Sequence, residues 1–367
     1  VVYSNSRLSQ IRDPLGRMVS YTYDNNQRLR VVTNPEGGLT QYTYDTQGNL
    51  LTITDARGIQ YIQNHHGASN RVLRQVMADG GEWRYQYHLQ GATVTGSGCP
   101  GFSCPTVETW ENVQAGYSFT GGTICATTVI DPVGVTRTTR FNTRGYTVDR
   151  MDGLGQKVVM HRGVSNQVTS RVNPLGRAIN FGYDERGNVT TIRDSTLQET
   201  RVAYEPSFNG ISRITNAIGK DTTFDYDTRG NVTRVTNPVM ASSHVTYSAL
   251  GQILHIQLPD LTEPPTSFAY DPVGNLTTIT NSLGQVTRRT FDGLSRVSTF
   301  SEPRGFTTRL DYDGLNQVTR LTNPVGGIST FGYDGNGNLV NRMAANSNQI
   351  FSYTYDSMDW LSSTGDP

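Results

Sequence analysis

The chain has 367 residues and a formal net charge of zero, from 31 basic and 31 acidic residues. No stretch collects the like charges that a phosphate backbone or an anionic membrane attracts, and no apolar run reaches the ~18–20 residues that cross a bilayer. These properties exclude nucleic acid as the expected partner and exclude a membrane span.

The hydrophobic fraction of 35% lies below the ~45–50% of an average globular domain, which argues against a thick core. Disorder is the alternative reading, but 19 Tyr and a zero net charge are not typical of a disordered chain. We therefore expect the chain to fold. It starts at Val1 without Met or a signal-type segment, so we expect it to be a fragment of a larger protein.

Residues 1–91 contain the first run of an internal repeat. A landmark of Tyr followed by Asp, or a degenerate form of it, recurs every 20–23 residues, at Tyr3, Tyr23, Tyr44, His65 and Tyr87. His65-His66 stands where Tyr-Asp belongs, and we interpret the pair as a degenerate turn and not as a metal site. A period of this length is typical of a protein built from one stacked supersecondary unit.

Each unit carries two turn signals about ten residues apart, the spacing of short strands joined by tight turns. In the first, Pro sets φ, Asx caps the turn and Gly completes it; in the second, Gly supplies a positive φ. Turns of the first type, Asx-Pro-x-Gly, stand at residues 13–16, 34–37, 131–134, 173–176 and 323–326. Turns of the second type, Asp-x-x-Gly-Asn, stand at residues 45–49, 184–188, 227–231, 271–275 and 334–338.

Between the turns run five to eight residues rich in Thr, Val, Ile and Tyr, which is strand composition. The spacing of three between Leu276 and Ile279 also fits a helix. A segment of about six residues, however, is too short to form a stable helix in water, and its β-branched residues disfavour one. In a strand this spacing predicts one apolar residue on each face. We therefore expect neither face of the sheet to be wholly apolar.

The second strand of a unit repeats a pair of aromatic residues two positions apart, which share one face of the strand. We predict that these rings form a structural ladder between units, in preference to a ligand-binding platform. The pairs are Tyr21/Tyr23, Tyr42/Tyr44, Tyr85/Tyr87, Phe181/Tyr183, Phe224/Tyr226, Phe268/Tyr270, Phe331/Tyr333 and Tyr353/Tyr355.

Residues 92–126 form an insertion loop, since the step from Tyr87 to Phe141 is 54 residues. Cys99 and Cys104 could close a small disulfide loop in an oxidising setting, with Cys125 unpaired or an alternative partner. The three cysteines lack the spacing and the fourth ligand of a zinc site, and no base accompanies a catalytic cysteine. The letters Gly-x-Gly-x-x-Gly at residues 96–101 open no helix, so we do not interpret them as a dinucleotide loop.

The repeat resumes over residues 127–367 and continues the architecture of residues 1–91, with landmarks from Phe141 through the degenerate His161 to Tyr355. Residues 334–338 open like a calcium loop, but Leu339 replaces the required Gly and Ala345 the required Glu. Carboxylates of a hydrolase cannot be told from turn aspartates. We therefore predict no catalytic, cofactor-binding or metal-binding residues, and no cofactor.

Two strands per unit give about 28–30 strands and about 140 Å of sheet contour. Open twisted sheets rarely exceed ~10 strands without curling. We therefore predict an all-β meander that winds into a hollow spiral or barrel-like shell, about 45 Å across by the same spacing, with a polar lumen.

Residues 270–277, Tyr-Asp-Pro-Val-Gly-Asn-Leu-Thr, with residues 281–284, Asn-Ser-Leu-Gly, resemble YD repeats of the Rhs family. The resemblance covers nearly the whole chain outside the insertion. The family includes bacterial Rhs polymorphic toxins, the enclosing component of Tc toxins, wall-associated proteins and teneurins. The resemblance implies a β-shell that in bacterial members sequesters a C-terminal toxin.

Residues 355–367 are still repeat-like, so the cleavage segment and toxin of bacterial members have no counterpart at any numbered position. We expect a secreted or surface, non-enzymatic shell whose partner is a C-terminal toxin cargo or another protein. The alternative is a surface recognition module, in which the insertion, Trp83 and Trp110 contact glycans or a partner protein.

Overall fold

The computed structural model describes residues 1–12, 16–35, 37–67, 69–95, 107–114, 118–120, 122–345, 349–356 and 359–366. Within these residues the protein is a long antiparallel meander with one five-residue helix, α1 (Trp110–Gln114). The strands before the insertion are β1 (Val2–Ser4), β2 (Arg7–Arg12), β3 (Met18–Tyr23), β4 (Leu29–Thr33), β5 (Leu39–Tyr44), β6 (Leu50–Thr54), β7 (Gln60–His66), β8 (Val72–Met77) and β9 (Glu82–Gln90). The insertion contains β10 (Thr93–Thr95), β11 (Val107–Glu108) and β12 (Ser118–Thr120).

The second run of repeats gives 23 strands of similar length. These are β13 (Thr123–Ile130), β14 (Thr136–Phe141), β15 (Thr147–Met151), β16 (Lys157–Arg162), β17 (Val168–Val172), β18 (Ala178–Tyr183), β19 (Val189–Arg193), β20 (Glu199–Tyr204), β21 (Ile211–Thr215), β22 (Asp221–Tyr226), β23 (Val232–Thr236), β24 (Ser242–Tyr247), β25 (Ile253–Gln257), β26 (Thr266–Tyr270), β27 (Leu276–Thr280), β28 (Val286–Phe291), β29 (Val297–Ser301), β30 (Thr307–Tyr312), β31 (Val318–Thr322), β32 (Ile328–Tyr333), β33 (Leu339–Met343), β34 (Ile350–Tyr355) and β35 (Leu361–Gly365).

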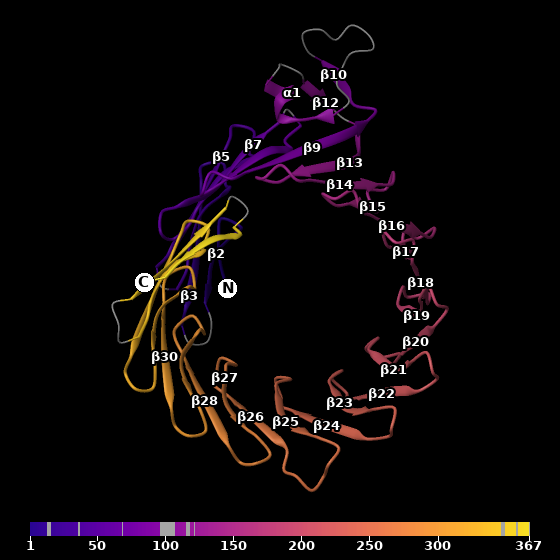
Figure 1. The fold of residues 1–367 in the computed structure, drawn as a ribbon, viewed down its shortest axis with the longest axis vertical. Helices are drawn as coiled ribbons and strands as arrows, with labels where there is room; N and C mark the ends of the chain where they lie inside the picture. The colour runs from indigo at the N-terminus through magenta and orange to yellow at the C-terminus, as the bar shows by residue number, and fades with distance from the viewer. Residues whose placement is uncertain are drawn as a thin grey trace.

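Each strand pairs with the next along the chain, and β9 passes the sheet on to β13, so that the described residues form one 33-stranded antiparallel sheet. Strands β10 and β12 form a separate pair, while β11 lies beside β9. Figure 1 shows the ribbon curving around an open centre, with the insertion on the outside of the ring. In the described residues the first strand pairs with β2 and the last with β34, so the sheet is a wound ribbon and not a closed barrel. The predicted all-β, hollow spiral architecture is confirmed.

Most of the turns form because the side chain of an Asx in first place caps them. Asp45 Oδ1 accepts the amides of Gln47 (2.9 Å) and Asn49 (2.8 Å), and Gly48 completes the turn at a φ of 94°, which glycine adopts without strain. Turns of this kind alternate between the two edges of the ribbon. We call edge A the side with the turns at residues 55–59, 77–81, 131–135, 152–156, 173–177, 194–198, 216–220, 237–241, 281–285 and 323–327, and edge B the side with the turns at residues 24–28, 45–49, 142–146, 163–167, 184–188, 227–231, 248–252, 271–275, 292–296, 313–317 and 334–338.

A β-bulge follows the edge-B turn in each regular unit and decides which side chains share a face. Tyr226 pairs with Val232 while Asp225 pairs with Arg234, so Thr233 is an extra residue. Because paired residues share a face, Val232 lies on the side of Tyr226. The expectation that a spacing of three puts one apolar residue on each face was therefore wrong, because the bulge shifts the alternation by one residue.

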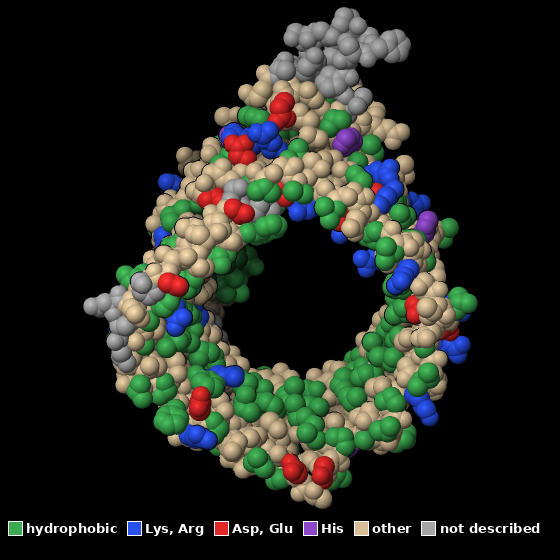
Figure 2. Space-filling view, in the orientation of Figure 1, with side chains coloured by type: hydrophobic (Ala, Val, Ile, Leu, Met, Phe, Trp, Pro, Cys, Tyr) green, Lys and Arg blue, Asp and Glu red, His purple; other side chains and the backbone are tan. Residues whose placement is uncertain are grey.

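The bulge makes the ribbon two-sided. One side, the apolar face, carries Tyr226 with Val232 and Phe224 with its partner Val235, and the opposite side carries Asp225 with Arg234. The same arrangement recurs in the other regular units, for example where Tyr270 pairs with Leu276. Figure 2 shows hydrophobic side chains gathered on the wall of the opening along its lower arc, where Figure 1 places β23–β28.

The opposite face of these strands carries mainly polar residues, among them the pairs Asp225 with Arg234 and His244 with Gln257. The hydrophobic wall of the opening is therefore formed by the apolar face. The expectation of a polar lumen was wrong for this arc, since it rested on mixed faces that the bulges remove.

The side chains of the apolar face, such as Phe224 and Val235, are half-buried by their neighbours and are not among the fully buried ones. The buried hydrophobic side chains among the described residues are Leu73, Leu89, Phe119 and Ala126, all near the insertion. The accessible surface is 21899 Å², whereas a compact monomer of 40.5 kDa would expose about 14,600 Å². The ribbon is therefore one sheet thick around a hollow.

Candidate functional site: wall, seam and insertion

The second tyrosine of the aromatic pair ties each hairpin to the one before it. Tyr44 donates its hydroxyl hydrogen bond to the Leu29 carbonyl, 15 residues earlier, at 2.8 Å. Burial raises the pKa of Tyr44 and of Tyr226, whose hydroxyl bonds to Ile211 at 2.8 Å. The same bond is made by Tyr23, Tyr87, Tyr183, Tyr204, Tyr247, Tyr312 and Tyr333.

Two degenerate units show which groups can take the tyrosine's place. His66, not His65, occupies its position, because the bulge lies between these two residues, and Asn64 Nδ2 bonds the Leu50 carbonyl instead, at 3.1 Å. Arg162, not His161, occupies the position in the other unit, and its Nε donates to Thr147 O at 2.7 Å. Both landmarks were predicted one residue too early, because nothing in the letters locates the bulge.

The insertion supplies a carboxylate that the degenerate unit lacks. In two regular units the turn Asp binds an Arg four residues on, Asp24 with Arg28 at 2.7 Å and Asp292 with Arg296 at 2.6 Å. Gly67 replaces this Asp, and the fully buried Glu108 of β11 binds Arg71 through Oε2 at 2.6 Å. A side chain at Gly67 would collide with Glu108 Oε1, which has no hydrogen-bond partner. Glu108 therefore anchors the insertion to Arg71, at the place that the turn Asp, Asp24 or Asp292, takes in other units.

The ends of the ribbon overlap and form a seam. Figure 1 draws the C-terminal strands, in yellow, across the N-terminal strands, in indigo, and interactions between them show that they lie side by side. Arg17 Nη1 donates to Gly293 O at 2.9 Å and to Ser295 Oγ at 2.6 Å, across 276 and 278 residues. One winding therefore takes about 13 units, or about 26 strands, with a contour of about 125 Å.

Arg57 makes the second link across the seam. Its guanidinium is held by the buried Asp55 at 3.0 Å and donates to the carbonyls of Asp334 (3.1 Å) and Gly335 (3.4 Å). A pocket of about 270 Å³ lies at this place, and Tyr61 and Leu315 are among its lining residues. Edge A of the first winding thus packs on edge B of the second.

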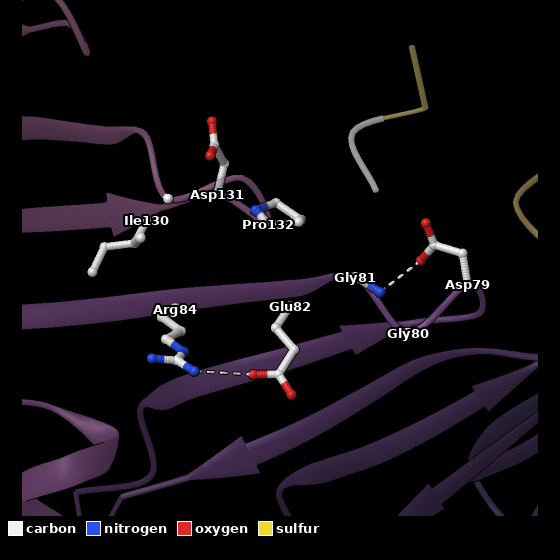
Figure 3. A pocket seen from close by; sticks show the side chains of 9 residues that line it. Asp79, Gly80, Gly81, Glu82, Arg84, Ile130, Asp131 and Pro132 are labelled. Carbon is white, nitrogen blue, oxygen red and sulfur yellow. Dashed lines mark hydrogen bonds and ion pairs between the residues drawn. The ribbon is translucent and has the colours of Figure 1, made fainter. Parts of the chain in front are cut away.

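A second pocket, of about 420 Å³, lies between the edge-A turns that follow β8 and β13 (Figure 3). Its carboxylates are engaged in structural bonds: Asp79 accepts the Gly81 amide, Glu82 binds Arg84 at 3.4 Å, and the buried Asp131 binds Arg137 at 3.1 Å. The hydrogen bond from Arg74 lowers the pKa of Glu82. These groups are neither paired with a nucleophile nor arranged as an acid and a base.

The cysteines and histidines were the candidates for a disulfide and for a metal site. Cys99 and Cys104 lie outside the described residues. Cys125 is a free thiol that donates to His88 O at 3.3 Å. Within the described ranges no cluster of three His, Cys, Asp or Glu could hold a metal. The ring centroid of His65 lies 5.1 Å from that of Trp110. Burial lowers the pKa of His65.

Comparison with known proteins places the repeat. The RHS Repeat model matches residues 3–39, 25–60, 164–196 and 270–307, and no curated protein sequence matches the chain. The Tc holotoxin pore of Photorhabdus luminescens is 16% identical, with a TM-score of 0.43, over 94% of this chain and 24% of that one. A structure of TcdB2-TccC3 without its hypervariable C-terminal region is 16% identical, with a TM-score of 0.45, over 95% of this chain and 20% of that one.

The chain thus spans about a quarter or less of the length of these solved proteins. The described residues contain no helix that is long and apolar enough to span a membrane. The four model matches fall in both runs of the repeat, and the same tyrosine bond and turn cap recur between them. The chain is a member of the Rhs/YD-repeat family.

Proposed function

We propose that this ribbon is part of a shell that holds or presents an extended polypeptide, with a C-terminal toxin or effector as the cargo. The observation that carries the proposal is the apolar face, which lines the opening without being covered by a core. Apolar surface of this kind gains about 25 cal/mol per Å² when a ligand removes it from water.

The backbone of the wall favours contact through side chains. The strands along the opening are paired on both sides, as β23 is with β22 and β24, so an enclosed polypeptide finds few free amides there to extend the sheet. A chain with exposed apolar side chains, such as an unfolded segment, fits this surface. Membership of the Rhs/YD-repeat family supports a toxin cargo and a secreted or surface location for the protein.

The recognition role receives no comparable support. Trp83 and Trp110 are both partly covered, and Trp110 lies against His65. The comparisons give no support for a glycan partner. We also propose that the ribbon acts as a structural component and not as an enzyme.

Binding of a permanently unfolded protein tests the proposed function. Reduced, carboxymethylated α-lactalbumin carrying a fluorophore is titrated with the purified chain, and anisotropy is recorded. We expect saturable binding, weakened about tenfold by the double substitution Val235→Thr and Ile256→Thr, which keeps strand shape but removes apolar wall. The matched control, Thr236→Ser with Thr246→Ser on the opposite face, should bind like the wild type.

Failure to bind, or equal weakening by wall and control variants, would contradict the proposal. Circular dichroism of each variant establishes that it is folded.

A further inference from the structure

The wall of the opening is not apolar along its whole length. The face that carries Val235 continues through strands β14–β18, and there Arg150 and Arg171 hold the place of Val235. Each stands three residues after the residue that pairs with the tyrosine position at the bulge, as Val235 does. Both arginines are exposed. Figure 2 shows basic side chains bordering the opening on its right side, where Figure 1 places these strands.

Strands β14–β18 offer these arginines no carboxylate on the same face. The acidic residue of the five strands is Asp149, which lies on the opposite face and binds Arg140 at 2.8 Å and Lys157 at 3.3 Å. Asp152, in the adjoining edge-A turn, caps that turn by accepting two backbone amides. Within the described residues Arg150 forms no ion pair, and the same is true of Arg171.

A third uncompensated charge lies on the strand between them. Arg162 of β16, in the tyrosine position of the wall, donates to two backbone carbonyls, at 2.7 and 2.5 Å, and to no carboxylate of the described residues. Arg137 of β14 is on this face too, but Asp131 binds it at 3.1 Å. We call Arg150, Arg162 and Arg171 the basic arc. It places three positive charges on three neighbouring strands, β15–β17.

Arginines elsewhere on the apolar face stand singly and beside aromatic rings. The guanidinium of Arg289 lies over the ring of Phe300, 6.0 Å from its centroid. Arg342 is paired on its two sides with Phe331 and Phe351. An aromatic face attracts a cation and covers part of it. The basic arc lacks such neighbours in register, and its charges face the opening.

We propose, on the basis of the function proposed above, that the basic arc binds an acidic segment of the enclosed polypeptide. Arg150 and Arg171 are two strands apart, which is about 10 Å. Residues three apart in a polyproline-II chain, a common conformer of unfolded segments, are about 9 Å apart and point the same way. Carboxylates at every third residue of such a segment would therefore reach both arginines, and guanidinium groups bind carboxylates through paired hydrogen bonds.

The residues around the arc favour a polypeptide over a nucleic acid as the occupant. Val158 pairs with Arg150 and Ile179 with Arg171, so apolar side chains of a bound segment find contacts beside the charges. Single-stranded nucleic acids need aromatic rings on which bases stack. In the two units of the arc the first ring of the aromatic pair is replaced, by Thr139 and Met160.

Three matched peptides test the assignment on the full chain. Each is fluorescent, shares one Gly, Ser and Leu background, and carries Glu, Gln or Lys at every third position; a length of about 20 residues, ~60 Å when extended, exceeds the width of the arc. Anisotropy is recorded in low salt. We expect the Glu peptide to bind about tenfold more tightly than the Gln peptide, and the Lys peptide to bind most weakly. Salt at 1 M, which screens charges beyond about 3 Å, should remove the difference.

Substitutions in the wall locate the effect. The double variant Arg150→Gln with Arg171→Gln should lose the preference for the Glu peptide and keep the wild-type affinity for the Gln peptide, which shows that it is folded. The matched control, Arg201→Gln with Arg213→Gln, removes two exposed arginines from the opposite face. It should keep the preference.

Equal binding of the Glu and Gln peptides by the wild type, or the same loss of preference in the wall and control variants, would overturn this inference and leave the proposed function standing. Tighter binding of an oligothymidylate of the same length than of the Glu peptide would also overturn it, since nucleic acid would then be the occupant. If none of the three peptides binds, the proposed function fails together with the inference.

Discussion

At the scale of single residues, the Tyr-Asp landmark makes two backbone contacts. The tyrosine hydroxyl holds a carbonyl 15 residues earlier, as Tyr333 does with Val318 at 2.9 Å, and the next residue caps a turn. Both groups act on backbone that would otherwise lack partners on a thin sheet. We propose on this basis that the aromatic ladder is scaffold, and that its first ring, Tyr or Phe, contributes packing alone.

Tyr44→Phe tests the hydroxyl. The change leaves the Leu29 carbonyl without its donor, and we expect a loss of about 1–2 kcal/mol in the local free energy of unfolding, read from hydrogen exchange of β4 and β5. Tyr42→Phe, on the same strand, is the control and should change it by less than ~0.5 kcal/mol. Equal effects of the two substitutions would show that the hydroxyl bond is not the reason for the tyrosine.

Glu108 tests whether the insertion repairs the degenerate unit. Glu108→Ala removes the partner of the largely covered Arg71 and should destabilise the insertion by about 3 kcal/mol, seen as faster exchange in β9 and β11. Gly67→Asp alone should also destabilise, because it collides with Glu108. The double variant should recover stability, since the introduced carboxylate would bind Arg71 as Asp24 binds Arg28. If the stability losses of the two single variants simply add in the double variant, Glu108 does not take the place of the missing turn Asp.

At the scale of elements, the bulge is what makes a strand pair amphipathic. Deleting the extra residue Thr233 would move Val232 to the polar face. We expect this deletion to cost several times more than Thr233→Ala, which removes one hydroxyl bond to Asp225 O at 3.3 Å and costs about 1 kcal/mol. Denaturant unfolding compares the two, and similar midpoints would mean that register is not set by the bulge.

The elements also show how far the sequence predicts this structure. Turn letters such as those of residues 45–49 locate the hairpins because Asp and Gly have few other uses in that spacing. No sequence motif marks a β-bulge. The strand register at His66 and Arg162, and the face of the sheet on which Val232 lies, could therefore not be predicted from the sequence. Contacts across about 276 residues, such as that of Arg17 with Gly293, depend on the summed curvature of many strands, which no local pattern encodes.

At the scale of the whole molecule, acid should loosen the ribbon through its turns. The hydrogen bonds from Asn188 and Asn231 side chains hold the pKa of Asp184 and of Asp227 below the usual value. A lowered folded pKa contributes stability that is complete above the unfolded value, ~3.9, and is lost as the pH falls through the folded pKa. We therefore expect the denaturation midpoint to hold from pH 7 to about pH 5 and to fall below it.

The double substitution Asp184→Asn and Asp227→Asn is the matched variant. It keeps the Oδ1 cap, which Asn173 provides in its own turn with Leu175 and Arg177, but removes the titrating group. The variant should lose less stability between pH 5 and pH 3 than the wild type does. Identical acid profiles would show that these caps do not set the response.

The winding of the ribbon around an open centre is the claim on which the wall, the seam and the proposed cargo all depend. Single-particle electron microscopy of the purified chain tests it most directly. We expect end-on views to show a ring of one sheet's thickness with no density in the middle and with overlapping ends. Class averages of a filled, compact particle, or of an extended ribbon whose ends never meet, would contradict it.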